Sequence, residues 1–397
     1  MQAEIPYGAY WSTPFARWQG AFAHLHSLRF AAHTARRALA DRSIDPGVFD
    51  LAVLGITRPE RGSFYGAPWF MGLLGSTAAG GPTVSQACAT SVRTLSNAAA
   101  AVSLGDAARV LVVACDRTSN GPHIYYPNPL ASGGTGESEN FILDNMACDP
   151  LGPHPMIRTA ENVATKYGVS KEEQHEVVLL REEQYRRACE NSHAFHKRYM
   201  RLPFPIPDAR MVKVHGQLEG DDGIRFSTSE GLAALKPVVE GGSVTFGAQT
   251  HPADGNAAMV VTTPDKAAEL SQDPAIRIRL LGFGMSRAPL AYMPEAPIEA
   301  AKRALRAANR QLSDLSAINT HNPFAINDIV LSKAMGIPIT DMNRFGCSLV
   351  FGHPNAPTGL RSTIELIEEL VQRGGGAGLF TGCAAGDTAM ALVLEVH

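Results

Sequence analysis

The sequence of 397 residues lacks the features of a secreted or membrane-spanning protein. No two of its six cysteines form a C-x-x-C pair of the kind that holds structural zinc, and their spacing is not that of a disulfide framework (positions 88, 115, 148, 189, 347 and 383). The N-terminus has no basic segment followed by an apolar one, and no run reaches the roughly 18 apolar residues of a membrane span. We therefore expect a cytoplasmic protein with reduced thiols and no membrane span.

A strong excess of charge is also missing. The formal net charge is −3, and 18% of the residues are charged against 45% hydrophobic, which indicates a folded globular chain. Such a chain has no general attraction for nucleic acid, although a local basic patch for a phosphate-bearing ligand remains compatible with it. The length of the chain predicts two or three packed units, or one large duplicated fold. The small net charge favours small molecules or proteins as partners.

Helix and strand patterns alternate in the N-terminal part of the chain. Residues 49–57 are predicted to form a buried strand, residues 91–106 an Ala-rich helix and residues 108–115 a second strand. The order strand, helix, strand is typical of an α/β protein.

The pattern returns near the C-terminus. Residues 360–376 are predicted to form an amphipathic helix stopped by glycines, with apolar strands after it. Laying Val92 over Leu360 also lays Cys115 over Cys383, because both pairs are 268 positions apart. This register predicts an internal duplication, although helix–strand units resemble one another in any α/β protein.

The middle of the chain differs in composition from both repeats. It is rich in proline and glycine, has little strand signal and contains a strongly charged helix at residues 171–190. Residues 242–263 are predicted to form two strands joined by a Pro-Ala-Asp-Gly turn, which would return the chain to the first sheet. The predicted domains are an N-terminal half (1–118, completed by 242–264), an inserted loop domain (119–241) and a C-terminal half (265–397).

Cys88 and His353 are the first candidates for chemistry. Cys88 directly precedes the Ala-rich helix, whose free N–H groups and dipole would favour the thiolate, although an isolated cysteine at a helix start is more often a packing residue. His353 lies at the matching place in the second half, between a glycine and a proline that define a special backbone path. A pseudo-twofold axis would bring this imidazole toward the thiol as its base, unless the histidine only caps or fills the core.

Cys383 and His321 are further candidates. Cys383 ends an apolar strand, where an exposed thiol could act as acid or base; otherwise it packs like its repeat mate Cys115. His321 is predicted to lie between a strand and a helix, where a role as a helix cap is equally consistent with the sequence.

Three motifs, in order along most of the chain, resemble those of the thiolase superfamily. SQACATSVRTL (85–95) is similar to the family's nucleophile block, FGHPNAPTGLR (351–361) to its Gly-His-Pro block, and GCAAGDTAMALVLE (382–395) to its C-terminal Cys-Gly-Gly-Gly block. Supporting matches are MIRTAENVATKYGVSKEEQ (156–174), STSEGLAALKP (227–237) and ADGNAAMVV (253–261).

The resemblance implies an α/β thiolase fold, five-layered αβαβα, of two duplicated halves with a loop domain over the active site. It implies that Cys88 accepts an acyl group from coenzyme A (CoA) as a thioester, that His353 activates it, and that Cys383 moves a proton at the α-carbon of the second acyl-CoA. The backbone N–H groups of Cys88 and Ala385 would form one oxyanion hole, and His353 with His321 the other. CoA would be a substrate, with no metal and no permanently bound cofactor.

Two positions match the family's contacts with substrate and the pantetheine arm, namely Met156 and Thr250, although Pro155 replaces a common histidine. The family often has Asn-Glu-Ala-Phe where residues 321–324 are His-Asn-Pro-Phe, which resembles sterol-carrier-type thiolases. Those thiolases take their acid from a cysteine in that block, whereas this chain has proline there and keeps Cys383. The C-terminal block, with Ala-Ala-Gly after its cysteine, also departs from the family pattern, so the subfamily stays open.

The function implied is that of a 3-ketoacyl-CoA thiolase, an acyltransferase that cleaves a 3-ketoacyl-CoA with CoA or runs the reverse Claisen condensation. Two alternatives stay open: a decarboxylating condensing enzyme that uses Cys88, His321 and His353, and a thiolase-like subunit that binds acyl-CoA or lipid beside a partner. The resemblance also implies a homodimer or dimer of dimers, and a small zinc-ribbon and OB-fold protein as partner. The loop domain, including HIYYPNPL (123–130), is expected to set acyl specificity, and its aromatic content suggests a group bulkier than acetoacetyl.

Overall fold

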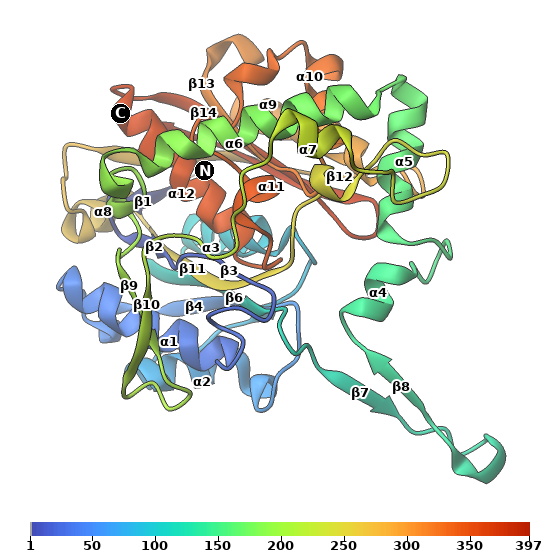
Figure 1. The fold of residues 1–397 in the computed structure, drawn as a ribbon. Helices are drawn as coiled ribbons and strands as arrows, with labels where there is room; N and C mark the ends of the chain where they lie inside the picture. The colour runs from blue at the N-terminus through green and yellow to red at the C-terminus, as the bar shows by residue number, and fades with distance from the viewer. Residues whose placement is uncertain (1) are drawn as a thin grey trace.

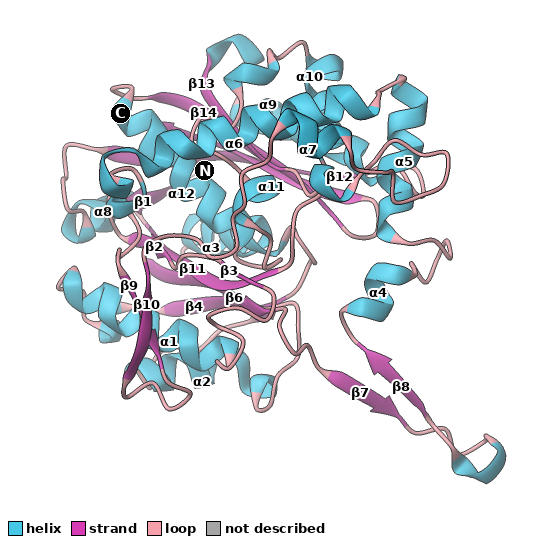
Figure 2. Cartoon of the chain, viewed as in Figure 1, coloured by secondary structure: helices cyan, strands magenta, loops and turns pink. Residues whose placement is uncertain are grey.

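A large mixed β-sheet with helices on its faces forms the centre of the computed structural model, which describes residues 2–397 (Figures 1 and 2). Its strands follow the order β13-β14-β15-β12-β1-β11-β6-β4-β5, with β2 and β3 also paired to β11. β1 (Ala3–Pro6) joins the two halves, because it pairs with β11 on one side and β12 on the other. The strands are β2 (Tyr10–Ser12), β3 (Ala16–Arg17), β4 (Leu51–Gly55), β5 (Thr83–Val84), β6 (Arg109–Arg117), β11 (Ala253–Thr262), β12 (Arg277–Arg287), β13 (Leu315–His321), β14 (Gly376–Ala384) and β15 (Thr388–Val396).

Helices complete five layers, as the resemblance implies. α3 (Thr90–Leu104) and α12 (Thr358–Gln372) lie together between the two halves of the sheet, and α1 (Ser27–Asp41) with α2 (Gly66–Leu74) covers the outer face of the N-terminal half. The outer face of the C-terminal half packs against α9 (Ala296–Ala308) and α10 (Ala325–Met335).

β6 shows why the sheet needs helices on both faces. Val110 and Val112 point into the cluster formed with α3 and α12, whereas Leu111 and Val113 pack against α1 and α2. Because successive side chains of a strand point to opposite faces, an apolar run of this kind must be covered twice.

The predicted duplication has a direct structural counterpart in α3 and α12. Both helices have 15 residues, and their first residues, Thr90 and Thr358, are 268 positions apart. The helices approach closely at Gly359, where an added Cβ would lie 3.0 Å from the Cβ of Ser91. A glycine at this contact therefore allows the two helix starts to meet.

The segment 119–241 contains more strand than the sequence predicts, because two short hairpins carry no long apolar run. The first, β7 (His123–Tyr126) and β8 (Glu137–Asn140), extends away from the rest of the chain (Figure 1). The second pairs β9 (Phe204–Pro207) with β10 (Val214–Leu218). The predicted charged helix is α6 (Lys171–His193), and the remaining helices here and beyond are α4 (Leu143–Ala147), α5 (Met156–Tyr167), α7 (Ser229–Ala233), α8 (Pro264–Leu270) and α11 (Ser348–Phe351).

The two strands and turn predicted for residues 242–263 are wrong. Asp254 and Gly255 lie inside the single strand β11, antiparallel to β6. The Asp254 carboxylate accepts hydrogen bonds from the N–H groups of Thr118 (2.6 Å) and Ser119 (2.9 Å), so this aspartate anchors the chain after β6 instead of forming a turn. No helix among residues 2–397 is both long and apolar enough to cross a membrane.

Candidate active site

Cys88 lies on a tight turn between β5 and the start of α3. Ala87, just before it, has a φ of +43°, which is unusual for a residue other than glycine. Thr90 closes the turn: its hydroxyl donates to the Ala87 carbonyl (2.7 Å) and accepts from the Gln86 N–H (2.8 Å). The turn therefore places Cys88, a partly exposed residue, directly before the helix, as predicted.

His353 is held by a backbone path that requires its glycine neighbour. Gly352 has a φ of +88°, and a Cβ there would lie 2.7 Å from Nε2 of His251. His353 bridges to Pro252 at the start of β11, and its Nδ1 is 2.7 Å from the hydroxyl of Thr358, the first residue of α12. This contact orients the imidazole at the helix start.

The tertiary structure brings Cys88, His321 and His353 together. Reactive atoms of the three side chains lie within 4.8 Å of one another, and the two imidazoles stack with centroids 4.0 Å apart. His321 ends β13, as predicted, and its Nδ1 is 2.8 Å from the Ser348 hydroxyl. Nε2 of each ring is buried and has no hydrogen-bond partner among residues 2–397, so both nitrogens are available to a ligand.

Cys383 lies next to this group but is buried. It belongs to β14 and is 1% exposed, so the expectation of an exposed thiol is wrong. The amide of Asn327 donates a hydrogen bond to its Sγ at 3.3 Å. Burial raises the pKa of Cys383 well above its usual value, and the nearby Cys88 adds to the shift.

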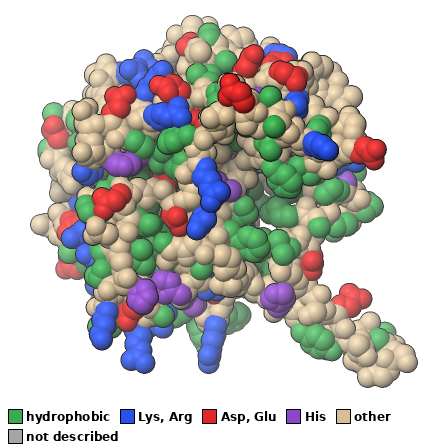
Figure 3. Space-filling view, in the orientation of Figure 1, with side chains coloured by type: hydrophobic (Ala, Val, Ile, Leu, Met, Phe, Trp, Pro, Cys, Tyr) green, Lys and Arg blue, Asp and Glu red, His purple; other side chains and the backbone are tan. Residues whose placement is uncertain are grey.

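A cavity of about 290 Å³ opens beside Cys88. Among the predicted residues, Cys88, His353, Ala385, Met156 and Thr250 line it. Most of the other lining side chains are apolar, including Ile142, Met146, Ile157, Val238, Met293 and Phe324. Hydrophobic side chains also gather on the right of the face shown in Figure 3, above the β7–β8 hairpin. The cavity therefore suits an apolar chain beside Cys88.

The stretch HIYYPNPL (123–130) does not line this cavity, contrary to expectation. It belongs to the projecting hairpin, where Tyr125 is 59% and Leu130 96% exposed. Ile142 and Met146, which follow the hairpin, take the place in the wall instead. Sequence composition identified the loop domain but not the residues that fold back from it.

Burial dominates the electrostatics of the site and reverses one expectation. It raises the pKa of Cys88 to about 11, even though the Ala385 and Cys88 N–H groups and the charge of Arg58 lower it. The N–H groups favour the thiolate, but burial outweighs them, so the net shift is opposite to the one predicted. Burial also lowers the pKa of His321 to about 3 and that of His353 well below 6.5. Burial therefore favours the neutral form of the thiol and of both imidazoles.

Arg58 and Asp116 form a buried ion pair beside the cavity that the sequence patterns did not predict. Arg58 lines the cavity and is 4% exposed, with Nη1 3.3 Å from the Asp116 carboxylate. Asp116 also accepts hydrogen bonds from Thr57 and from the N–H of Ala356 (2.8 Å), near His353. One sequence signal could have indicated this pair: each residue directly follows a predicted strand, Arg58 after residues 49–57 and Asp116 after residues 108–115.

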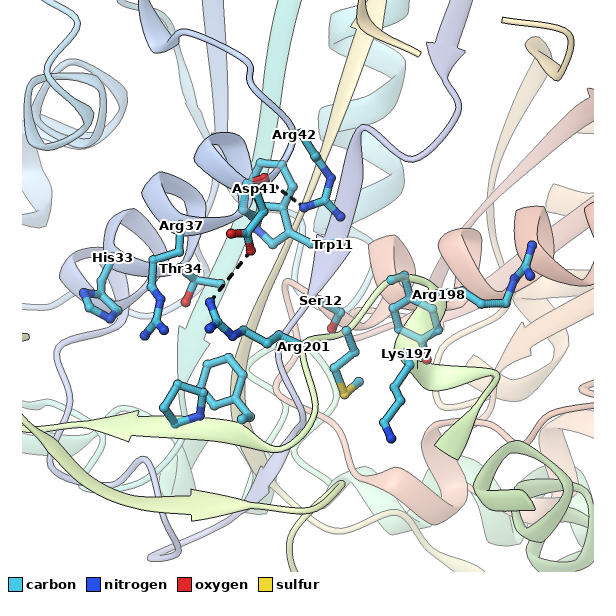
Figure 4. A pocket seen from close by; sticks show the side chains of 15 residues that line it. Trp11, Ser12, His33, Thr34, Arg37, Asp41, Arg42, Lys197, Arg198 and Arg201 are labelled. Atoms are coloured by element: carbon cyan, nitrogen blue, oxygen red, sulfur yellow. Dashed lines mark hydrogen bonds and ion pairs between the residues drawn. The ribbon is translucent and has the colours of Figure 1, made fainter. Parts of the chain in front are cut away.

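A second cavity, of about 260 Å³, lies beside the end of α1 (Figure 4). Its wall is mostly cationic, so it is a local basic patch of the kind that the net charge of the chain does not exclude. None of the predicted catalytic residues lines it. The charged side chains in the wall are Arg37, Arg42, Lys197, Arg198, Arg201 and Asp41. Cys88 and His353 line the cavity of about 290 Å³ instead.

Comparison with known proteins gives consistent matches over nearly the whole chain. Residues 9–265 match the family model "Thiolase, N-terminal domain", and residues 275–396 match "Thiolase, C-terminal domain". The chain is 28% identical to an acetyl-CoA acetyltransferase of Escherichia coli over 79% of each chain, and 28% identical to a 3-ketoacyl-CoA thiolase of Aliivibrio fischeri over 97% of this chain and 94% of that protein.

Solved structures agree in fold. Human mitochondrial 3-ketoacyl-CoA thiolase superposes with a TM-score of 0.90 at 22% identity and covers all of both chains. The same human protein in complex with CoA gives a TM-score of 0.89 at 22% identity and covers 100% of this chain and 98% of the other.

Proposed function

This chain belongs to the thiolase family, and we propose that it cleaves a 3-ketoacyl-CoA with free CoA, or runs the reverse Claisen condensation, through an acyl thioester on Cys88. The observation that carries the proposal is the group of Cys88, His321 and His353 within 4.8 Å, with a second thiol beside it. One thiol can bond to the acyl group while the other moves a proton, which is the division of labour that this reaction needs.

The first half-reaction begins with a proton transfer. Cys88 gives its thiol proton to Nε2 of His353, and the thiolate attacks the 3-keto carbon of the substrate. The bond between carbons 2 and 3 then breaks, and the departing enolate takes the proton of Cys383 to leave as acetyl-CoA. An acyl thioester on Cys88, a protonated His353 and a Cys383 thiolate remain, so charge is conserved.

The second half-reaction restores the site. Free CoA gives its thiol proton to Cys383 and attacks the acyl group on Cys88. The Cys88 sulfur leaves as a thiolate and takes back the proton from His353. The high pKa of Cys383 suits this role, because a thiol that holds its proton firmly becomes a strong base once it has lost it.

Oxyanions form on the acyl carbon and on the enolate, and each needs fixed donors. The N–H groups of Cys88 and Ala385 both lower the pKa of the Cys88 thiol. They therefore favour negative charge on the sulfur, and we assign them to the oxyanion that forms beside it. For the enolate we assign the ring N–H groups of His353 and His321. These residues remain the proposed catalytic set: Cys88, His353, Cys383 and His321, with Met156 and Thr250 against substrate.

Ser348 would determine which ring nitrogen of His321 carries the proton. The serine hydroxyl has one proton and two acceptors nearby, Nδ1 of His321 at 2.8 Å and Oδ1 of Asn322 at 3.2 Å. Donation along the shorter contact leaves the imidazole proton on Nε2, which then points a donor into the site.

The direct test is an acyl-transfer measurement on the purified chain. It is incubated with a panel of acyl-CoAs, and intact mass with peptide mapping locates any adduct. We expect an adduct on Cys88 that free CoA releases, and none in Cys88→Ala, with Cys148→Ser as a matched thiol control. Absence of an adduct with every donor would favour the acyl-CoA-binding subunit, and copurification would then seek the small zinc-ribbon and OB-fold partner.

Cys383 distinguishes the thiolase reaction from decarboxylating condensation. A condensing enzyme that makes its carbanion by loss of carbon dioxide needs Cys88, His321 and His353 but no second thiol. We therefore expect Cys383→Ser to cripple turnover. Full activity of this variant with a malonyl-type donor would establish the alternative.

A further inference from the structure

A second group of metal-binding side chains lies where α6 ends, outside the Cys88 cavity. Cys189, His193 and His196 each offer a ligand atom, and the three atoms lie within 4.8 Å of one another. Cys189 and His193 are partly exposed, whereas His196 is 1% exposed. We propose that this Cys189 cluster is a binding site for one zinc ion.

The two imidazoles already have a spacing close to that of zinc ligands. Nδ1 of His193 and Nδ1 of His196 face each other at 3.1 Å. In a tetrahedral site with zinc–nitrogen bonds of about 2.0–2.1 Å, two ligand nitrogens are about 3.3 Å apart, and a sulfur is about 3.6 Å from each nitrogen. The Cys189 sulfur lies within 4.8 Å of both histidine ligand atoms, and zinc binding would draw the three ligand atoms closer together.

An unusual backbone path holds His193 in this position. Asn191, Ser192 and His193 have φ values of +50°, +57° and +62°, three left-handed residues in succession. This left-handed conformation is unfavourable for residues that carry a side chain. Gly220 leaves room for the His193 ring, since a Cβ there would lie 2.8 Å from its Cε1. Strain that aims one imidazole at another is typical of a ligand site.

The donor set selects the ion. One thiolate and two imidazoles suit zinc or cobalt, whereas magnesium and calcium prefer oxygen ligands. Binding releases the Cys189 thiol proton to solvent as the sulfur–metal bond forms, and both histidines bind as neutral rings. The partly exposed side of the cluster leaves the fourth position to water.

The proposed ion would connect α6 to the segment that follows it. His196 is three residues before Tyr199, whose hydroxyl donates to Glu365 of α12 at 2.7 Å. Zinc at the Cys189 cluster would therefore fasten the end of α6 to a segment that is itself attached to α12. Its expected effect is thermal stability, independent of the acyl-transfer chemistry.

The test must exclude the catalytic group, because Cys88, His321 and His353 meet the same distance criterion. The full chain carrying Cys88→Ala is stripped with a chelator, and zinc binding is measured by calorimetry. Cobalt binding is followed by the absorption that a thiolate–cobalt bond produces. We expect one zinc per chain, a cobalt–thiolate band and a rise in melting temperature with zinc.

Two partly exposed ligands provide the variants, because removal of the buried His196 could unfold the chain. Cys189→Ser and His193→Ala should each weaken zinc binding at least tenfold, and Cys189→Ser should abolish the cobalt band and the thermal shift. Cys148→Ser, an exposed thiol, should change none of these. Zinc binding that is absent in the Cys88→Ala parent, or unchanged by Cys189→Ser, would overturn the proposal.

Discussion

His321 and His353 stack face to face, with ring centroids 4.0 Å apart and planes inclined by 29°. Two cations at this distance in a buried site would repel strongly, and His321 is one of the causes that lower the pKa of His353, after burial itself. The pair can therefore hold one added proton but not two. That limit suits a reaction in which a single proton from Cys88 is stored and returned.

Acid should destabilise the fold through His321. Its folded pKa of about 3 is below the unfolded value near 6.5, so the folded state disfavours the protonated ring. The stability that this group contributes is complete above about pH 6.5 and is lost as the pH falls toward 3.

The pH dependence can be isolated by comparing wild type with His321→Asn in urea unfolding between pH 4.5 and 7. We expect the free energy of unfolding of the variant to fall less steeply, by up to about 1.4 kcal/mol per pH unit. Identical slopes would mean that His321 is not buried as a neutral ring.

Removal of the Arg58 charge should raise the pKa of the Cys88 thiol. Its charge lowers the pKa of Cys88, so Arg58→Met should move the alkylation midpoint of this thiol above about 11 and slow alkylation at a given pH. Asp116 raises the same pKa, so adding Asp116→Asn should return the midpoint part of the way. The measurement is the iodoacetamide rate at Cys88 against pH, read by peptide mass. A midpoint unchanged in both variants would contradict the coupling.

Ser348 should decide which nitrogen of His321 carries the proton. In chains labelled with ¹⁵N-histidine, we expect wild type to show the proton on Nε2, and Ser348→Ala to show a mixture. Turnover of the variant should fall about tenfold with little change in KM, because one oxyanion donor is lost only part of the time. Ser332→Ala, in α10, serves as control. A wild-type ring protonated on Nδ1 would exclude His321 as the donor.

Gly352 should be required for the position of His353. Gly352→Ala places an alanine at φ +88° with its Cβ 2.7 Å from Nε2 of His251, whereas Gly374→Ala places one at φ +84° with no atom within 4 Å. Both variants should lose about 1–2 kcal/mol of unfolding free energy from backbone strain. Only Gly352→Ala should also lower kcat/KM, by tenfold or more. Equal activities would show that His353 tolerates the shift.

Much of the fold follows from local patterns in the sequence. The apolar runs and stopping glycines predict α3 and β6 to within two residues at each end, the start of α12 to within two residues, and the presence of strands after α12, where β14 and β15 lie. Such agreement is expected because helix and strand periods are properties of neighbouring residues. The order of the three motif blocks likewise identified the candidates that the fold then gathered. The prediction of a turn at 252–255 was wrong because the Asp254 carboxylate accepts hydrogen bonds from the N–H groups of the distant residues Thr118 and Ser119.

The sequence by itself thus determined the duplicated register and the identity of Cys88, His353 and Cys383 as candidates, and its resemblance to the thiolases implied the layers. Only the tertiary structure decided the burial that raises the pKa of Cys88 and lowers that of His321. It also decided that Arg58 pairs with Asp116 at the site, that residues 123–130 lie outside the cavity, and which side chains form its wall. These properties depend on distances between segments far apart in the chain, and no local pattern encodes such distances.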